Sequence, residues 1–292
     1  MRGSQMTDTI IQLIINGLLL GGIYALFSIG LTLIFGVLEV VNFAHGEFMM
    51  LSMYLTYFLF QLLGMDPYVS LIITIPVFFL FGIIIERLII HPLLNDPPIN
   101  QIFATIGLQL IFQNLALLFF KADFRTVKTD YSNANIIFGE MFVSVPRLIA
   151  FVIAALLIVA LFLYLKNTFT GKSIRALAQQ RKAAMLMGIN VYKTYMIAFG
   201  IGIACVGAAG SIMIPLYFVF PTAGSLFVLI AFVVVILGGY NSLGGTLVAG
   251  LIIGIIEGVS GFFISPHLKE VVYFIMFIFI LIFKPTGLFG RR

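Results

Sequence analysis

A Gly-Lys-Ser triplet at 171–173 is the part of the chain closest in composition to a nucleotide-binding loop. A phosphate-binding P-loop needs another glycine five positions before the second one, with a strand before the loop and a helix after it. Lys166 occupies that position here, and the apolar residues 162–165 before it are typical of the end of a membrane helix. Between Glu140 and Glu257 there is no aspartate or glutamate to hold magnesium. We therefore do not expect this chain to hydrolyse nucleotides, nor to need a cofactor of its own.

Polar side chains inside apolar segments are the next candidates for chemistry, because their burial in lipid is costly and they often mark a transport path. One group lies at the start of an apolar segment, a second lies at a polar break near Pro221, and single residues occur elsewhere. The candidate path residues are Asn42, His45, Glu47, Gln109, Ser225 and Glu257.

Each of these candidates also has a structural interpretation. The 42–47 cluster could start a helix beside a cavity, or it could cap a helix at the membrane interface. His45 as a proton relay is a further alternative. Glu257 could contact substrate or bond to a polar group on another helix, and Gln109 and Gln113, one turn apart, could join helices. The stretches 17–60 and 200–240 repeat the order helix, polar break, helix, which suggests that both breaks approach one path.

Metal binding and disulfide chemistry are not expected. The single cysteine, Cys205, lies in an apolar run, so no disulfide can form within the chain. The histidines at 45, 91 and 267 are far apart in sequence and lack the spacing of metal ligands.

The composition predicts an integral membrane protein. Of 292 residues, 62% are hydrophobic and 9% are charged, and the mean hydropathy is +1.18. A soluble domain is about 25% charged and could not cover so much apolar surface. We expect an all-α, polytopic fold of about eight to ten transmembrane helices. The apolar runs lie at roughly 10–36, 43–63, 68–90, 99–120, 147–165, 194–217, 225–239, 246–263 and 270–284.

The arrangement of the chain follows from these runs. Residues 1–5 are interpreted as a remnant of an expression tag, and 6–292 as one transmembrane domain. The first run is expected to be tilted or broken at Gly21-Gly22 or at Gly30. The segment 166–193 contains lysines and arginines but no acid, so it is predicted to be cytoplasmic. The loop at 121–146 is then external, the N-terminus outside and the C-terminal tail inside.

Residues 171–190 are expected to form one short helix beside the membrane, capped by Ser173 and ended at Gly188 or Asn190. Contact with anionic lipid is the simpler interpretation of its basic side chains. However, the pattern T-x-x-G-K-x-I-R-A-x-A, continued by A-A-x-x-x-G-I-N, resembles the cytoplasmic coupling loop of branched-chain amino-acid ABC importer permeases of the LivH/LivM type. The N-F-A-H-G-E run at 42–47 and the stretch AFVVVILGGYNSLGGTLVAG at 231–250 are similar to the same family.

The resemblance covers almost the whole chain and implies a permease subunit without enzymatic activity, in the bacterial cytoplasmic (inner) membrane. It implies two ATP-binding subunits that hold ATP and magnesium, a second LivM-like permease, and an extracytoplasmic substrate-binding protein. No nucleic acid is expected among the partners. The residues that it assigns to coupling with the ATP-binding subunits are Gly171, Arg175, Ala176, Arg181, Ala184 and Gly188.

Glycines spaced by four predict close helix packing, either within the subunit or to a partner. They are Gly17 and Gly21 in the first run, and Gly250, Gly254 and Gly258 in the eighth. Branched-chain amino acids are the substrate that the resemblance favours, while urea and short-chain amides stay open because similar permeases serve them. An ion-coupled secondary transporter using His45, Glu47 or Glu257 is the alternative class, and a membrane-embedded enzyme is the least favoured.

Overall fold

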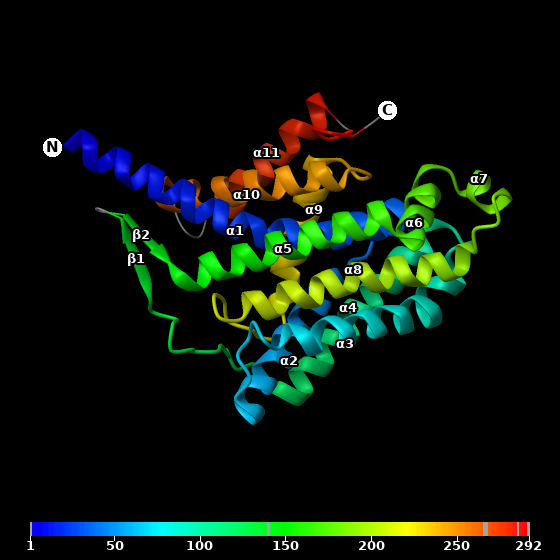
Figure 1. Ribbon diagram of the computed structural model, residues 1–292, viewed down its shortest axis with the longest axis horizontal. Coiled ribbons are helices and arrows are strands. Elements are labelled where there is room, and N and C mark those ends of the chain that lie inside the picture. Colours follow the sequence, from blue (N-terminus) through cyan, green and yellow to red (C-terminus); the bar gives the residue numbers. More distant parts are fainter. Residues whose placement is uncertain (1, 139–140, 265–267, 285, 291–292) are drawn as a thin grey trace.

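The structure is a computed structural model that describes residues 2–138, 141–264, 268–284 and 286–290 (Figure 1). Residues 139–140 of the predicted external loop, and His267, lie outside the described residues. Within these described ranges, seven helices are long and apolar enough to cross a membrane, and two shorter apolar helices accompany them. The predicted all-α, polytopic fold is therefore confirmed, with each apolar run of the sequence forming a helix.

The elements follow one another in the order of the predicted runs, with short helices and a strand pair between them. They are α1 (Arg2–Leu38), α2 (His45–Leu63), α3 (Leu71–Ile85), the π-helical turn η1 (Glu86–Ile90), the 3-10 turn η2 (His91–Leu93), α4 (Pro98–Phe120), β1 (Asn135–Phe138), β2 (Met141–Ser144), α5 (Val145–Asn167), α6 (Phe169–Gln179), α7 (Arg181–Leu186), α8 (Val191–Met213), α9 (Ala223–Gly238), α10 (Leu243–Phe263) and α11 (Lys269–Phe283).

Helix α1 is continuous, so of the two alternatives for the first run a break at Gly21-Gly22 or Gly30 is wrong, and a tilt stays a prediction. These glycines serve close packing instead. A methyl group added at Gly22 would meet the ring of Phe151, and one added at Gly30 would overlap the carbonyl of Gly202. Because α1 is buried among its neighbours over most of its length, its small residues let α5 and α8 approach.

Helices α1 and α10 also cross at glycines. An added methyl group at Gly17 would lie 2.5 Å from the carbonyl oxygen of Gly254, and one at Gly21 would lie 2.7 Å from that of Gly250. Gly258 continues the contact one turn further, where the same group would lie 3.3 Å from the Cα of Gly17. The glycines spaced by four thus pack against each other within this chain.

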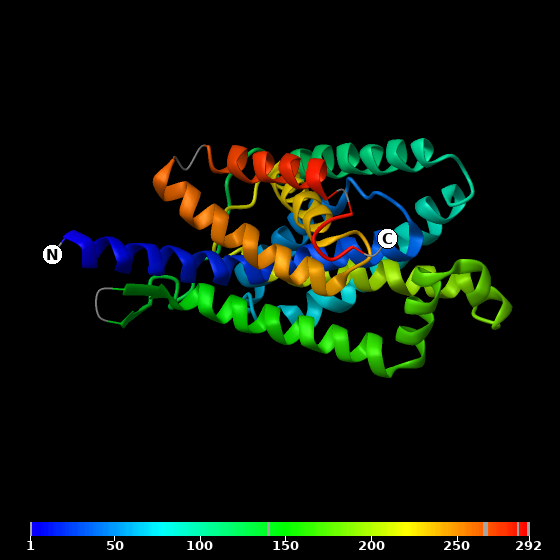
Figure 2. The same ribbon diagram turned by 90° about the horizontal axis from the view of Figure 1, so that it is seen from above.

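The two polar segments 121–146 and 166–193 lie at opposite ends of the molecule, because α5 runs between them. The strands β1 and β2 pair antiparallel at the end where α1 begins, whereas α6, α7 and the C-terminal segment lie at the other end (Figures 1 and 2). The orientation prediction requires this separation, and which end faces the cytoplasm stays a prediction. The strand pair is a small non-helical addition that the sequence did not indicate.

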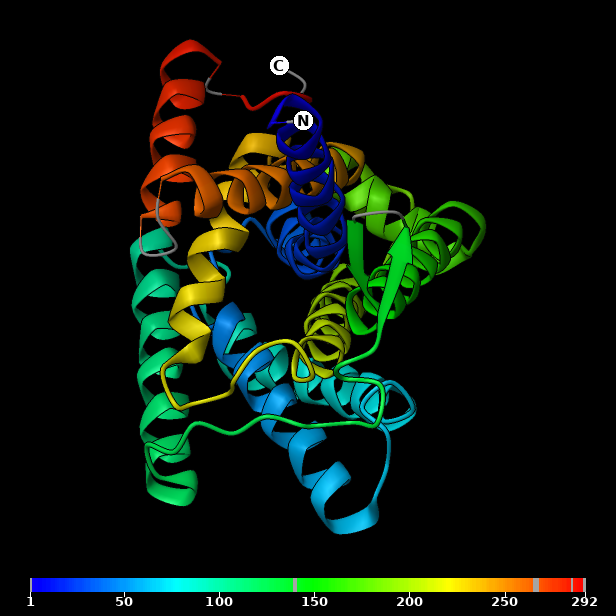
Figure 3. The ribbon, with the colours of Figure 1, turned by 90° about the vertical axis from the view of Figure 1, so that its left-hand side faces the viewer.

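Two outer sides of the bundle differ in the helices that form them. Helices α4 and α11 lie along one side, with α9 beside them, and α5 lies along the opposite side (Figures 2 and 3). Helix α8 is largely buried and packs on α1, α2 and α3. This arrangement brings the starts of α2 and α9 together next to α4.

Candidate functional site

The two polar breaks of the sequence meet in space. Helix α2 begins after the break at 39–44, and α9 begins after the turn that contains Pro221. Their first turns touch at Gly46 and Gly224, where a methyl group on Gly46 would overlap the carbonyl of Gly224. A side chain at either glycine would force the helices apart, so the backbone contact requires both.

A hydrogen-bonded cluster lies beside this contact and joins three helices. Gln113 of α4 donates from Nε2 to Oε1 of Glu47, on α2, at 2.8 Å and to Oγ of Ser225, on α9, also at 2.8 Å. Gln109, one turn earlier, donates to Oγ of Ser225 at a longer 3.4 Å. We call Glu47, Gln109, Gln113 and Ser225 the central cluster. The structure thus brings together three of the six predicted path residues, with Gln113 as their link.

The central cluster joins a buried carboxyl group to a partly open surface. Glu47 is fully buried, and Gly224 packs directly against its carboxylate. Gln109, Gln113 and Ser225 are half-buried. Among the described residues the ion pairs are His91–Glu86 and Arg125–Asp123, so the Glu47 carboxylate has no cationic partner there. A buried carboxylate of this kind is costly, and a cationic group close by would stabilise it.

Asn42 and His45 have structural contacts instead. The Oδ1 of Asn42 accepts a hydrogen bond from the backbone N–H of Ala44 at 3.1 Å, which is the geometry of a turn before a helix. The Nε2 of His45 lies 3.0 Å from the carbonyl oxygen of Phe27, and because a carbonyl can only accept, this nitrogen carries the proton. Helix α2 has no side-chain cap, so the capping interpretation is wrong in detail. Asn42 shapes the turn before α2, and His45 ties α2 to α1.

Glu257 belongs to a different contact. Its side chain is hydrogen-bonded to the hydroxyl of Tyr24 on α1, which also interacts with Tyr217. The Oγ of Ser260 donates to the Glu257 backbone carbonyl at 3.3 Å. Glu257 therefore ties α10 to α1, and the structure does not place it in the central cluster.

The predicted single helix over 171–190 is two helices, α6 and α7, separated at Gln180. Gln180 has an extended backbone with φ −158° and ψ 102°, which no helix can contain. The cap of α6 is Thr168, whose Oγ1 accepts from the N–H of Gly171 at 3.0 Å, and not Ser173, whose hydroxyl donates to the carbonyl of Phe169. Gly188, with φ +80°, turns the chain after α7, where a residue with a side chain would be strained.

The residues predicted to couple this segment to a partner divide by burial. Arg175, Arg181 and Gly188 are exposed, and Ala176 is half-buried. Gly171 packs against the backbone of α5, and Ala184 is buried, so these two shape the segment from inside. The exposed apolar residues of the segment were missed: Phe169, Met185, Leu186 and Met187. Leu186 is 89% exposed. This exposure could be predicted from the sequence only if the break between α6 and α7 at Gln180 were already known.

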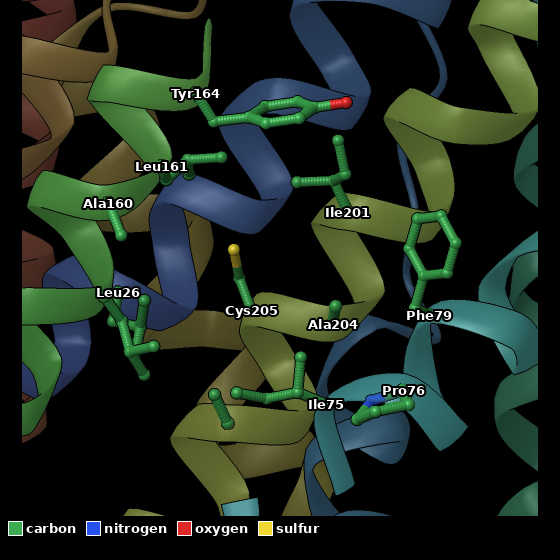
Figure 4. Close-up of a pocket in the computed structure, with 12 residues that line it drawn as sticks. Leu26, Ile75, Pro76, Phe79, Ala160, Leu161, Tyr164, Ile201, Ala204 and Cys205 are labelled. Atoms are coloured by element: carbon green, nitrogen blue, oxygen red, sulfur yellow. The ribbon is translucent and has the colours of Figure 1, made fainter. Parts of the chain in front are cut away.

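Two cavities lie away from the central cluster. One, of about 550 Å³, is an apolar groove between α3, α5 and α8, where Pro76, Leu161 and Cys205 line the walls (Figure 4). The other, of about 660 Å³, lies between α1, α6 and the turn before α10, and includes Arg175 and Asn241. Within the described part of the chain, no group of three or more His, Cys, Asp or Glu side chains is placed to hold a metal.

Comparison with known proteins identifies the class. A family model described as branched-chain amino acid transport system, permease component, matches residues 13–281. The permease protein BraD of Pseudomonas aeruginosa and the permease protein LivH of Salmonella typhimurium, each named for a high-affinity branched-chain amino acid transport system, are both 30% identical to this chain. In each case the match covers 96% of both sequences.

A more distant relative agrees. A probable LivH permease of Methanocaldococcus jannaschii is 28% identical over 96% of this chain and 92% of its own length. No solved structure matches the chain. Together with its membrane-spanning helices, these matches show that the chain belongs to the family of permease components of branched-chain amino acid transport systems.

Proposed function

We propose that this chain is the membrane-spanning permease subunit of an ATP-driven importer of branched-chain amino acids in the bacterial inner membrane. ATP and magnesium are bound by two separate ATP-binding subunits. A second permease chain completes the transmembrane part, and a substrate-binding protein delivers amino acids from outside. The family match supports the transport class, and the names of the relatives support the substrate.

The observation that carries the proposal is the central cluster within a bundle of this family. Glu47, Gln113 and Ser225 come from three different helices, and two of these helices begin at the cluster. Helix starts at membrane depth are where transporters hold polar substrate groups, since the unpaired N–H groups there need partners. A small rearrangement of α2 against α9 would therefore alter the polar contacts of the path.

A zwitterionic amino acid fits the charge of this cluster. Its ammonium group can pair with the Glu47 carboxylate, which lacks a cation among the described residues. Neutral urea and amides offer no positive charge and gain less from a carboxylate. Uptake of leucine, isoleucine and valine should therefore exceed uptake of urea or acetamide.

The first test is co-purification. A tagged chain, solubilised gently from its native membrane, is expected to bring down two ATP-binding subunits and a second permease. The purified complex is then placed in liposomes and given radiolabelled leucine, isoleucine, valine, urea and acetamide, with ATP or without it. A chain that purifies alone, or that transports without ATP, would contradict the proposal.

The α6–α7 segment provides a second test, because its exposed Leu186 can contact another subunit. Leu186→Glu should abolish association with the ATP-binding subunits, since a charge in an apolar contact leaves it desolvated and unpaired. Ala184→Glu is a poorer test, because Ala184 is buried and the change would disturb α7 itself. The matched control is Ile137→Glu, an exposed apolar residue of β1 at the opposite end of the molecule. Equal association of both variants would exclude α7 from the contact.

A further inference from the structure

One outer side of the bundle carries polar side chains near the middle of a candidate membrane span. Helix α4 is 23 residues long, and Gln109, Gln113 and Asn114 lie near its middle. Asn114 is exposed and the two glutamines are half-buried. At the start of α9 beside them, Thr222 is exposed and Ser225 half-buried. We call these residues the polar patch: Gln109, Gln113, Asn114, Thr222 and Ser225.

Lipid is a poor neighbour for this patch. An amide or hydroxyl in hydrocarbon without a hydrogen-bond partner costs several kcal/mol, so such groups face protein or water in membrane proteins. The side chain of Asn114 returns to its own helix, where it donates to the carbonyl of Leu110 at 2.7 Å. Among the described residues, no donor is hydrogen-bonded to the amide oxygens of the patch. These oxygens can therefore accept hydrogen bonds from another molecule.

The opposite side of the bundle has the apolar surface that contact with lipid requires. The exposed residues in the middle of α5 include Val152, Leu156 and Val159, and those of α3 include Leu80 and Ile84. No polar side chain is exposed among residues 148–163 of α5, a fully described stretch. The polar patch is therefore a local exception on the α4 side.

The rest of the α4 side has the make-up of a helix-packing surface. Phe103, Leu110 and Leu117 are exposed at seven-residue spacing, so they form one stripe with Asn114. Leu226 and Leu229 extend the apolar surface onto α9. From Phe103 to Leu117 the stripe covers about 21 Å of a helix about 34 Å long, enough to pack along most of a transmembrane helix.

We propose that a second permease chain packs on the surface formed by α4 and the start of α9, with the polar patch facing it. Amide side chains both donate and accept hydrogen bonds, so a similar surface of a related chain is complementary to this one. The apolar stripe supplies the packing contacts, and the exposed members of the patch, Asn114 and Thr222, supply the interhelical hydrogen bonds. The half-buried members stay bonded within the central cluster. This inference rests on the proposed function, because it takes the partner to be the second permease of the importer.

Photo-crosslinking in intact membranes tests the surface. The photoreactive amino acid p-benzoylphenylalanine replaces Leu110 or Leu117, one at a time, in the complete complex. The matched controls are Leu115, on the other flank of α4, and Leu156 on α5. Mass spectrometry identifies each adduct, and uptake by each variant confirms that the complex is assembled.

We expect the probe at Leu110 or Leu117 to form an adduct with a second permease chain. The probe at Leu156 is expected to form adducts with lipid only. Lipid adducts alone from both α4 stripe positions, or permease adducts from Leu156 alone, would overturn the proposal. ATP-dependent uptake by the same membranes is measured separately. If uptake depends on ATP while the stripe reacts only with lipid, the surface is wrong and the proposed function stands. Uptake without ATP would instead refute the function.

Discussion

Two of the three buried glutamates among the described residues, Glu47 and Glu257, lie in opposite kinds of surroundings. Glu257 is hydrogen-bonded to Tyr24, which is itself fully enclosed, so its contact joins α10 to α1 inside the bundle. Glu47 accepts a hydrogen bond from Gln113, which is half-buried and belongs to the polar patch on the outer side of α4. Glu257 is therefore bonded within the interior, whereas Glu47 is connected through Gln113 to an open surface.

This difference shows that burial alone does not assign a role to a charged residue in a membrane helix. Both side chains are close to fully buried, at 0% and 5% exposure. They differ in the residue to which each side chain is hydrogen-bonded, which is half-buried Gln113 for Glu47 and buried Tyr24 for Glu257. A buried group that bonds to a surface amide can exchange that bond for one to a solute, whereas a group enclosed by tyrosines cannot do so without opening the bundle.

The largest expected effect comes from neutralising each glutamate. Glu47→Gln should lower leucine uptake about tenfold or more, because the ammonium group of leucine loses its carboxylate partner. A hydrogen bond to a charged group contributes about 1.5–3 kcal/mol. Glu257→Gln should leave uptake within about threefold while lowering thermal stability, as a tie between helices is weakened. Uptake by liposomes and the unfolding temperature of each complex are the measurements. Equal loss of uptake in both variants would remove the distinction between the two sites.

The glycine beneath the Glu47 carboxylate should give the next largest effect. Gly224→Ala places a methyl group on the carboxylate of Glu47, and overpacking of this kind costs about 1–3 kcal/mol. We expect uptake to fall several-fold in this variant. Gly107→Ala on α4 is the matched control, because an added methyl group there meets nothing within 4 Å. A fall of the same size in both variants would show that the α2–α9 contact has no special place in transport.

The smallest effects distinguish the two glutamines. Gln113→Leu removes two hydrogen bonds of 2.8 Å and should lower uptake several-fold, at about 0.5–1.5 kcal/mol for each bond. Gln109→Leu removes one of 3.4 Å and should change uptake less than about twofold. The ratio of leucine uptake in the two variants is the measurement. A stronger effect of Gln109→Leu would reverse the order of contacts within the central cluster.

The sequence predicted the fold well because lipid imposes a strong rule on it. Each apolar run had to become a helix, and the run at 43–63 became α2 at His45–Leu63. The break within 171–190 was not predictable, since Gln180 is a good helix former and nothing in the local sequence marks its extended backbone. The strand pair formed in a loop with no periodic signal.

The central cluster could be predicted in its members but not in its connections. Asn42, His45 and Glu47 look alike in sequence, as polar residues at one helix start. Only the structure shows that Glu47 alone reaches α4, and that Gln113 bonds to residues 66 and 112 positions away. Contacts over such separations depend on how α2, α4 and α9 pack, which no local pattern specifies.

The most direct measurement asks whether the central cluster meets water and substrate. In a Cys205→Ala background, Ser225→Cys and Ser260→Cys place a thiol beside Glu47 and Glu257 respectively. The assembled complex is treated with a membrane-impermeant thiol reagent, with leucine or without it. The account predicts that the Ser225→Cys variant is labelled, that leucine slows its labelling, and that the Ser260→Cys variant stays unlabelled. Labelling at Ser260→Cys with none at Ser225→Cys would contradict it.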